Sequence, residues 1–242
     1  MQIRLATRPA ALFGAMLVVM LLALLPMRAA LGWIGAGDDG LVVRTASGSV
    51  WDGRLTDVRF GGLALGDMDA AVSPFALLLG RARIAVDGRD PAQPVHGAAS
   101  LSRHGVAVDS MTAHIPTGSL FAPVPVSAID LDTVSVRFRD GQCESADGRV
   151  TATLASGGIA GITLPATLSG PARCDGGSLL VPLVSQAGTE GITIRITGAG
   201  SYHADLSLRP GDPAAVARLT GAGFAEQGGT YRLSIDGRFR QS

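Results

Sequence analysis

The order of apolar and polar residues divides the chain into a short apolar start and a long remainder in which the two kinds alternate. From Pro9 to Met27 there are 19 residues without a charge, and most of them are Leu, Val, Met and Ala. A helix rises about 1.5 Å per residue and needs roughly 20 apolar residues to cross the hydrocarbon core of a bilayer. The pattern therefore predicts a transmembrane helix, with residues 1–34 forming a cytoplasmic tail and a membrane anchor.

The charges beside this apolar run predict its orientation. Arg4 and Arg8 precede the run and Arg28 follows it, and an excess of arginine favours the cytoplasmic side of a membrane. The alternative is a cleaved signal peptide with Ala11 to Leu25 as its apolar core, although the candidate cleavage point near Arg28 has no small-x-small triplet. Both interpretations place residues 35–242 on the far side of the membrane.

After Gly40 the dominant period is two, which is typical of half-buried strands. The segments with the clearest alternation are Leu55–Phe60, Ala82–Asp87, Leu131–Phe138, Val150–Leu154, Ile192–Ile196 and Tyr231–Ile235. We therefore expect the exported part to consist mostly of antiparallel hairpins.

Asp-Gly dipeptides predict where these strands turn, because Asp-Gly readily adopts the positive φ angles of a hairpin loop. Seven such dipeptides begin at Asp39, Asp52, Asp87, Asp140, Asp147, Asp175 and Asp236. Two of them lie in segments that echo each other, Ile84–Arg89 and Leu233–Arg238. Each of these two segments is predicted to be a strand that ends in the same turn.

Helical signals in the exported part are few. Ser73 and Pro74 open a short apolar stretch that Gly80 closes, and Asp212 with Pro213 opens a second one. Ser or Asp as N-cap followed by Pro at the first helical position is typical of a helix start. The expected fold is therefore mainly β: an N-terminal transmembrane helix, then an antiparallel β-rich domain over residues 35–242 with one or two short helices, divided into two subdomains, if at all, near residues 125–130.

Composition excludes several classes of function. The chain has 20 basic and 20 acidic residues, and its net charge is zero, so no basic stripe marks a nucleic-acid interface. Every basic residue apart from the four histidines is arginine. The absence of lysine excludes Schiff-base chemistry and a phosphate-binding Walker lysine.

The two cysteines, Cys143 and Cys174, both lie in the exported part. In an oxidising compartment an isolated pair is most simply one disulfide bond. Its loop would stabilise the fold by roughly 3–4 kcal/mol according to the chain-entropy relation. The alternative is two buried thiols.

The usual signatures of catalysis are missing from the sequence. No serine lies in a G-x-S-x-G elbow, and His96, His104, His114 and His203 form no H-E-x-x-H pair. Gly35 to Gly40 matches G-x-G-x-x-G by letters, but the match carries two acidic residues that would repel a pyrophosphate. We therefore expect no catalytic residue, no metal ligand set and no cofactor.

The most specific part of the sequence is residues 46–81. Gly48-Ser-Val-Trp-Asp-Gly-Arg-Leu55 is followed by Gly61-Gly62, by Leu65-Gly66 and by Ser73-Pro-Phe-Ala-Leu-Leu-Leu-Gly-Arg81. A strand ending in Val-Trp-x-Gly, a hairpin and a proline-led Leu-Leu turn resemble the type II secretion system protein N family. The N-terminal anchor, the length and the second half of the chain fit this family as well.

The resemblance implies a non-catalytic accessory component of the type II secretion system, which exports folded periplasmic proteins. The protein would be a single-pass inner-membrane protein with the bulk of its chain in the periplasm. Its partners would be other secretion components, in the inner-membrane platform or the secretin. The segments expected to make these contacts are represented by Trp51, Gly53, Arg54, Pro74 and Leu78.

Two alternatives stay open. Trp51 sits where a strand meets a turn and could equally be a plug in the core. A membrane-tethered periplasmic domain of the AsmA-like class could instead carry lipid between membranes or maintain the envelope. A lipid carrier needs a continuous apolar groove, whereas an assembly module needs an exposed edge or patch.

Overall fold

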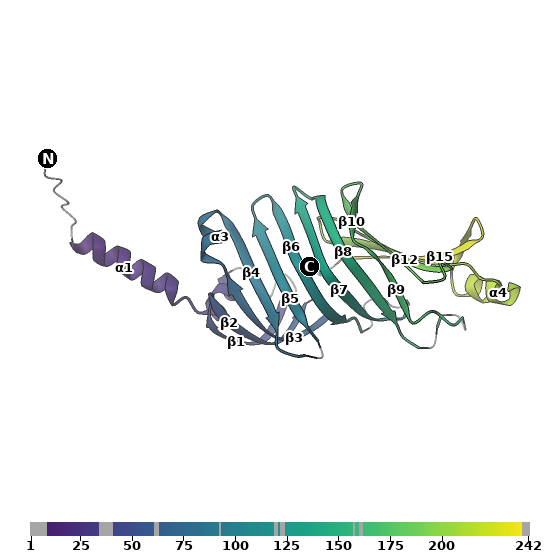
Figure 1. Cartoon of the computed structure of the whole chain (residues 1–242), viewed down its shortest axis with the longest axis horizontal. Helices are drawn as coiled ribbons and strands as arrows, with labels where there is room; N and C mark the ends of the chain where they lie inside the picture. The colour runs from purple at the N-terminus through teal and green to yellow at the C-terminus, as the bar shows by residue number, and fades with distance from the viewer. Residues whose placement is uncertain are drawn as a thin grey trace.

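The computed structural model describes residues 9–33, 41–60, 63–91, 93–118, 121, 124–156, 158–159 and 162–238. Within these residues the chain forms one antiparallel sheet of 15 strands with short helices, so the mainly β, antiparallel class is confirmed. The strand order is β1-β2-β3-β4-β5-β6-β7-β8-β9-β11-β12-β13-β15-β14, and β10 pairs with β11 beside this path. Figure 1 shows a long, curved row of strands with α1 extending from its N-terminal end and α4 at the opposite end.

The first eight strands are β1 (Leu41–Ser49), β2 (Asp52–Phe60), β3 (Leu63–Val72), β4 (Arg81–Gly88), β5 (Val95–Ser102), β6 (Gly105–Pro116), β7 (Val126–Arg139) and β8 (Gln142–Leu154). The others are β9 (Thr167–Pro171), β10 (Arg173–Asp175), β11 (Ser178–Val184), β12 (Glu190–Ile196), β13 (Ser201–Leu208), β14 (Ala225–Gln227) and β15 (Thr230–Arg238). The helices are α1 (Pro9–Ala23), α2 (Met27–Trp33), α3 (Pro74–Leu78) and α4 (Pro213–Gly221).

The N-terminal helix is shorter than the apolar run that predicts it. α1 ends at Ala23, and Pro26 forms an isolated bridge with Ser49 before α2 begins at Met27. Proline has no backbone N–H and disfavours the helical conformation in the residue before it, which explains the break. Among the described residues no helix is long and apolar enough to cross a membrane. The expected single helix over Pro9–Met27 is therefore corrected to two shorter ones.

The helix starts expected from Ser73 and Asp212 are confirmed. The Ser73 hydroxyl accepts a hydrogen bond from the backbone N–H of Ala76, and the Asp212 carboxylate accepts one from Ala214. Proline follows each cap at the first turn, where a missing N–H costs nothing. Both short helices thus begin where local chemistry alone predicts.

The Asp-Gly prediction is right at some positions and wrong at others. Asp140-Gly141 forms the loop between β7 and β8 with positive φ at both residues, and Asp175 ends β10 directly before Gly176. Asp39 lies outside the described residues. Asp52-Gly53 begins β2 directly after the turn at Val50 and Trp51, and Asp87-Gly88 ends β4, whereas the dipeptides at Asp147 and Asp236 lie within strands.

Close approach between strands explains the glycines at positions 88 and 237. A Cβ on Gly88 would lie 2.9 Å from the backbone nitrogen of Val95, and one on Gly237 would lie 2.3 Å from Cζ of Tyr202. The aspartate before each glycine pairs with a histidine on the neighbouring strand, Asp87 with His96 and Asp236 with His203. The echo between Ile84–Arg89 and Leu233–Arg238 therefore marks a shared cross-strand arrangement. The predicted strand end is right for the first segment, since β4 ends at Gly88, and wrong for the second, since β15 continues to Arg238.

Three of the shifts in strand register hold a residue with a positive φ angle that is not glycine. Asp57, Ser110 and Thr133 have positive φ angles of 49°, 48° and 53°, and each lies at a shift in strand register. Their backbone N–H groups donate to side-chain oxygens of neighbouring strands, at Asp67, Ser135 and Thr112 respectively. A bulge removes an amide from the regular ladder and increases local twist. These side-chain oxygens therefore accept hydrogen bonds from the amides that no longer take part in the strand ladder.

The described residues bury their apolar side chains in two separate clusters. The larger, which we call the C-terminal core, holds twenty buried residues from Phe121 to Tyr231. The smaller, the N-terminal core, holds Met27, Leu55, Val58, Met68 and Ala70. The division into subdomains near residues 125–130 stays a prediction.

One face of the sheet carries a row of apolar side chains that continues from strand to strand. Register partners from β3 to β8 form this row, which consists of Val72, Ile84, Ala99, Val108, Val136 and Ala146. Val136 is buried, whereas the other five side chains are half-buried. The opposite face of the early strands carries ion pairs such as Arg83 with Asp109, at 2.8 Å.

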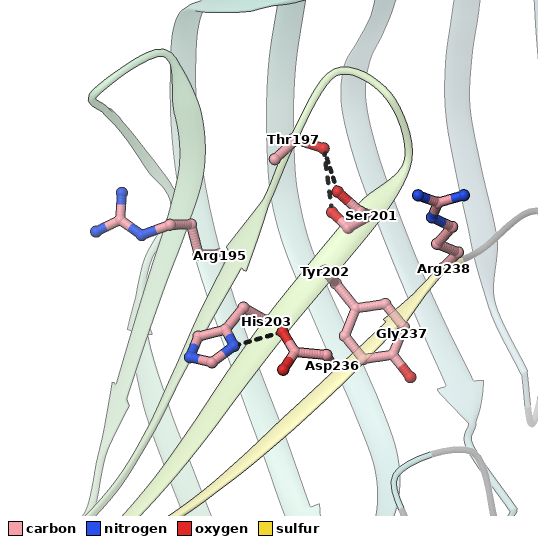
Figure 2. A pocket seen from close by; sticks show the side chains of 8 residues that line it. All are labelled: Arg195, Thr197, Ser201, Tyr202, His203, Asp236, Gly237 and Arg238. Carbon is pink, nitrogen blue, oxygen red and sulfur yellow. Dashed lines mark hydrogen bonds and ion pairs between the residues drawn. The ribbon is translucent and has the colours of Figure 1, made fainter.

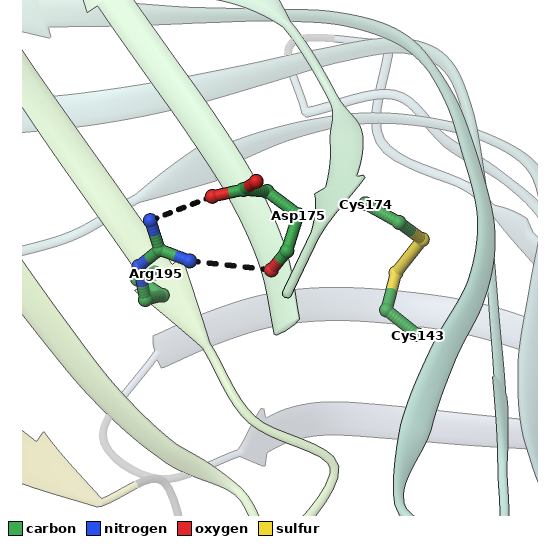
Figure 3. The surroundings of a disulfide bond; sticks show 4 residues. All are labelled: Cys143, Cys174, Asp175 and Arg195. Carbon is green, nitrogen blue, oxygen red and sulfur yellow. Dashed lines mark hydrogen bonds and ion pairs between the residues drawn. A yellow bond between two sulfur atoms is a disulfide. The ribbon is translucent and has the colours of Figure 1, made fainter. Parts of the chain in front are cut away.

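The sheet has a seam where β9 meets β11. A single register pair, Ser169 with Val184, joins these two strands. The disulfide between Cys143 on β8 and Cys174 on β10 lies beside this seam, with Cα atoms 5.5 Å apart. Figure 3 shows the bond together with Asp175 and Arg195. Next to it, Arg195 on β12 pairs with Asp175 at 2.8 Å. The predicted disulfide is therefore present, and it joins the first eight strands to the last group.

Candidate interaction surface

Three segments that are distant in sequence meet at the N-terminal end of the sheet. The backbone N–H of Val50, in the β1–β2 hairpin, donates to the carbonyl of Leu25 at 3.0 Å. The N–H of Val72, at the end of β3, donates to the carbonyl of Val50 at 2.9 Å. Leu25 lies two residues beyond α1, and Val72 lies two residues before α3. This chain of hydrogen bonds therefore holds the base of α1, the hairpin and the start of α3 together.

The hairpin residues Trp51, Gly53 and Arg54 have different surroundings. Trp51 is half-buried, and Gly53 is buried against Met27 of α2, whose Cε would lie 2.9 Å from a Cβ at that position. Arg54 is exposed and lies 3.6 Å from the carboxylate of Asp69. Gly53 thus gives the N-terminal core room for Met27, while Trp51 and Arg54 reach the surface.

The Asp69 carboxylate organises the polar face beside this hairpin. Arg89 donates to it at 2.9 Å from the next strand, and Arg54 approaches from the other side. The hydrogen bond from Arg89, together with the two positive charges, holds the pKa of Asp69 below its ordinary value. The carboxylate therefore remains ionised and links three neighbouring segments.

The turn that contains Pro74 and Leu78 is an exposed apolar projection. α3 has no buried residue. Phe75, Leu78 and Leu79 are 78%, 84% and 78% exposed. Monomeric proteins seldom expose contiguous large apolar groups, and such patches mark sites of contact with another molecule or a membrane. α3 is therefore the strongest candidate contact on this end of the sheet.

Arginines line an open groove of about 610 Å³ that begins at α3. It runs from Leu79 and Gly80 across the ends of β4, β5, β6 and β7, and five arginines line it: Arg81, Arg83, Arg103, Arg137 and Arg139. The carboxylate in the lining is Asp109, which pairs with Arg83. The surface beside α3 is consequently positive.

A second depression, of about 360 Å³, lies at the far end of the sheet around His203 (Figure 2). Nδ1 of His203 lies 2.7 Å from Asp236, and Nε2 lies 3.2 Å from Asp205. The hydrogen bond with Asp236 and the Asp205 charge raise the pKa of His203 above its ordinary value. Because both ring nitrogens face carboxylates, the imidazolium form is stabilised and neither nitrogen is placed to accept a proton from a substrate.

Metal coordination finds no support in the part of the chain that the structure describes. There, no group of three or more His, Cys, Asp or Glu side chains is arranged to hold a metal ion. His96, His104, His114 and His203 each lie within 4 Å of an aspartate on the surface.

The sequence indicated part of this surface and missed the rest. It singled out Trp51, Arg54, Pro74 and Leu78, and the Leu25–Val50–Val72 hydrogen bonds bring their two segments together. It missed Phe75 and Leu79 as exposed groups, because five helical residues are too few to reveal which face is buried. It also missed Arg81 and Arg103, which become neighbours only through the pairing of Arg81 with Ser102.

Comparison with known proteins identifies the family. Residues 39–234 match the family model described as type II secretion system (T2SS), protein N. One similar curated protein is the type II secretion system protein N of Vibrio cholerae serotype O1 (strain ATCC 39315 / El Tor Inaba N16961), which is 26% identical over 147 residues. That match covers 57% of this chain and 58% of the relative's length. No solved structure matches the chain. Since the family model covers most of the chain, the protein belongs to the type II secretion system protein N family.

Proposed function

We propose that the protein is a non-catalytic accessory component of the type II secretion system that acts by docking to other secretion components at the inner membrane. The observation that carries the proposal is the β1–β2 hairpin at the edge of the sheet, which a backbone hydrogen bond from Val50 to Leu25 ties to the base of the apolar helix α1. Family membership supports the secretion role. The contacts, the partner and the position in the envelope are our inference.

α1 would hold the chain at the membrane. Its described side chains are apolar, and Phe13, Met16 and Val19 are 73%, 75% and 64% exposed. Fifteen helical residues reach about 22 Å, and Leu24 and Leu25 continue the apolar character beyond the last turn. Burying this surface in lipid removes it from water, which is the favourable process for apolar side chains. The sheet would then lie in the periplasm, next to its partners.

Docking would use the hairpin around Val50 and the edge strand β1 that leads into it. Confinement to the membrane raises the effective concentration of other membrane-bound components, so modest affinity is sufficient. β1 lies at the edge of the sheet, and such an edge can pair with an extended segment of a partner through backbone groups. The candidate partners are components of the inner-membrane platform and the secretin.

A deletion strain of the source bacterium tests the secretion role. Without the protein, cargo should still fold in the periplasm but should accumulate there, which fractionation and immunoblotting of cargo would measure. Photo-cross-linking from position 51 should capture a secretion component, whereas the same cross-linker at the exposed Val184, on the other half of the sheet, should not. Unchanged secretion in the deletion strain would contradict the proposal.

The continuous apolar row from Val72 to Ala146 favours one second candidate, transfer of lipid along the sheet. An apolar face that remains only half-buried over β3 to β6 is what an acyl chain would need. Under this function the deletion would shift the lipid composition of the outer membrane while cargo secretion stayed at the wild-type level. The two measurements on one strain therefore separate the two functions.

A further inference from the structure

We propose that α3 and the arginines beside it form a second membrane contact, in which Phe75, Leu78 and Leu79 enter the periplasmic leaflet of the inner membrane. The occupant of this surface is thus a membrane that contains anionic phospholipid. Arg81 and Arg103 would bind the lipid phosphates at the same time. This inference rests on the proposed position of the chain at that membrane, and it adds a contact beyond α1.

The apolar part of the contact is α3 itself. Its start is fixed by the Ser73 cap and Pro74, and its end by Gly80, whose φ of +72° suits glycine. This framing projects Leu78 and Leu79 away from the sheet, where they are 84% and 78% exposed. A short, rigid turn that presents large apolar side chains loses little conformational entropy when it enters an interface.

The charged part of the contact follows directly in the chain. Arg81 is the residue after Gly80, and its pairing with Ser102 places the β5–β6 turn, with Arg103, beside it. Arg83 and Arg139 are already paired, with Asp109 and Glu144. Within the described ranges neither Arg81 nor Arg103 forms an ion pair with a carboxylate. Arg103 donates from Nε to Nε2 of His104 at 3.1 Å, which leaves its terminal nitrogens for a phosphate. Guanidinium groups bind phosphate oxygens in a bidentate manner, and basic residues near an anionic leaflet favour binding.

A membrane contact also requires that α3 lie close to the membrane, and its position in the molecule meets this requirement. Leu25, just beyond α1, is connected to Val72, just before α3, through the two backbone hydrogen bonds of Val50. Figure 1 shows α3 at the same end of the sheet as the base of α1. If α1 enters the membrane, α3 is held within reach of its surface.

Depth-dependent quenching in proteoliposomes tests this inference on the full chain. Leu78→Cys, Val184→Cys and Val19→Cys would each carry the same environment-sensitive fluorophore, and the disulfide keeps Cys143 and Cys174 from reacting. The vesicles would combine phosphatidylglycerol with phosphatidylcholine brominated on its acyl chains. We expect quenching at positions 78 and 19 and none at position 184, which is also an exposed apolar site.

Each outcome separates this contact from the anchor. Quenching at position 19 without quenching at 78 overturns the α3 contact and leaves the anchor, and it favours a protein as the occupant of α3. Quenching at 78 without quenching at 19 supports the α3 contact and removes the anchor. Absence of quenching at both positions overturns both proposals.

The arginines are tested in the same vesicles. Arg81→Gln and Arg103→Gln should each shift the balance between inserted and exposed α3 by roughly fivefold when phosphatidylglycerol is present. In vesicles of phosphatidylcholine alone these variants should behave like the parent. The matched variants Arg173→Gln on β10 and Arg218→Gln on α4, both distant from α3, should change nothing. Equal effects of both pairs would overturn the role of the arginines.

Discussion

Strands β1 to β6 and strands β7 to β15 are built from similar alternating hairpins, yet they bury their apolar side chains to different extents. In the second region the ring of Phe121 packs edge-on against Tyr202 of β13, with ring centroids 6.2 Å apart, and Leu219 of α4 is completely buried. In the first region the N-terminal core contains five buried residues, one of them supplied by α2, while Leu101 and Val106 remain 58% and 46% exposed. Whether an apolar face of the sheet is shielded from water therefore depends on a segment that packs over it, and not on the alternation within its strands.

The difference assigns different tasks to the two regions. The second region is stabilised by its own core, because a cluster of twenty buried side chains is removed from water there. The first depends on ladder hydrogen bonds, on surface ion pairs and on Met27, and it leaves α3 and part of an apolar face open. The open region is therefore the one that offers surface to another molecule.

The largest effect should come from the same substitution made in each core. Leu206→Ala should lower the free energy of unfolding by about 4 kcal/mol, because Leu206 is 1% exposed and its surroundings cannot collapse onto the space. Leu55→Ala in the N-terminal core should cost about 2 kcal/mol, since fewer neighbours surround it. Urea unfolding of the purified chain measures both, and Leu78→Ala is the exposed control. Equal costs at positions 206 and 55 would contradict the asymmetry.

Loss of the disulfide should have the second-largest effect on the free energy of unfolding. The variant with Cys143→Ala and Cys174→Ala should lose roughly 3 kcal/mol, because the bond closes a 31-residue separation across the seam. A reducing agent should lower the stability of the parent by a similar amount and leave this variant unchanged. Free thiols at both positions in the unfolded, unreduced parent would disprove the bond.

A substitution at the contact between α2 and the first region should lower stability by a smaller amount. Gly53→Ala should cost about 1–3 kcal/mol, because the new Cβ would lie 2.9 Å from Met27 Cε and 3.0 Å from the Ser49 carbonyl. Gly211→Ala, where nothing lies within 4 Å, is the matched control in the second region. Thermal unfolding measures the pair, and an unaffected Gly53→Ala variant would show that Met27 does not support the hairpin.

The smallest expected effect is a change of stability with pH, which arises from His203 in the second region. The folded state raises the pKa of His203, so its contribution to stability is complete below about pH 6.5 and is lost as pH rises through the folded value. Stability should thus decline slightly above about pH 6.5, and His203→Gln should remove that slope. His96→Gln changes the equivalent pair in the first region and should retain the slope. Because the His203 side chain is 43% exposed, solvent weakens the effect.

Local chemistry accounts for what could be predicted from the sequence. Alternation located the strands that contain Leu131–Phe138 and Tyr231–Ile235, and capping residues located α3 and α4. The strand-internal Asp-Gly dipeptide at Asp236 misled the turn prediction, since the role of Gly237 depends on Tyr202 of another strand. The bulge at Ser110 was likewise invisible, because Ser135, which accepts its N–H, is 25 residues away.

The same limit applies to the interaction surface. Pro74 and Leu78 were recognisable from a local motif, whereas Arg103 joins them only through the register of β4 and β5. The sequence also could not show which apolar faces become buried, because strands of both regions alternate between apolar and polar residues in the same way. Burial of the apolar face in the second region depends on where Phe121 and α4 pack after folding.

The most direct test of the central claim, that the open region is the one that binds, is cargo secretion by two matched surface variants. Leu78→Glu and Val184→Glu each place a charge on an exposed apolar site, one in each region, and neither removes a buried group. In the deletion strain, at equal protein levels, Leu78→Glu should reduce the secreted fraction of cargo, and Val184→Glu should restore secretion to the wild-type level. Full secretion with Leu78→Glu, or a defect confined to Val184→Glu, would contradict the account.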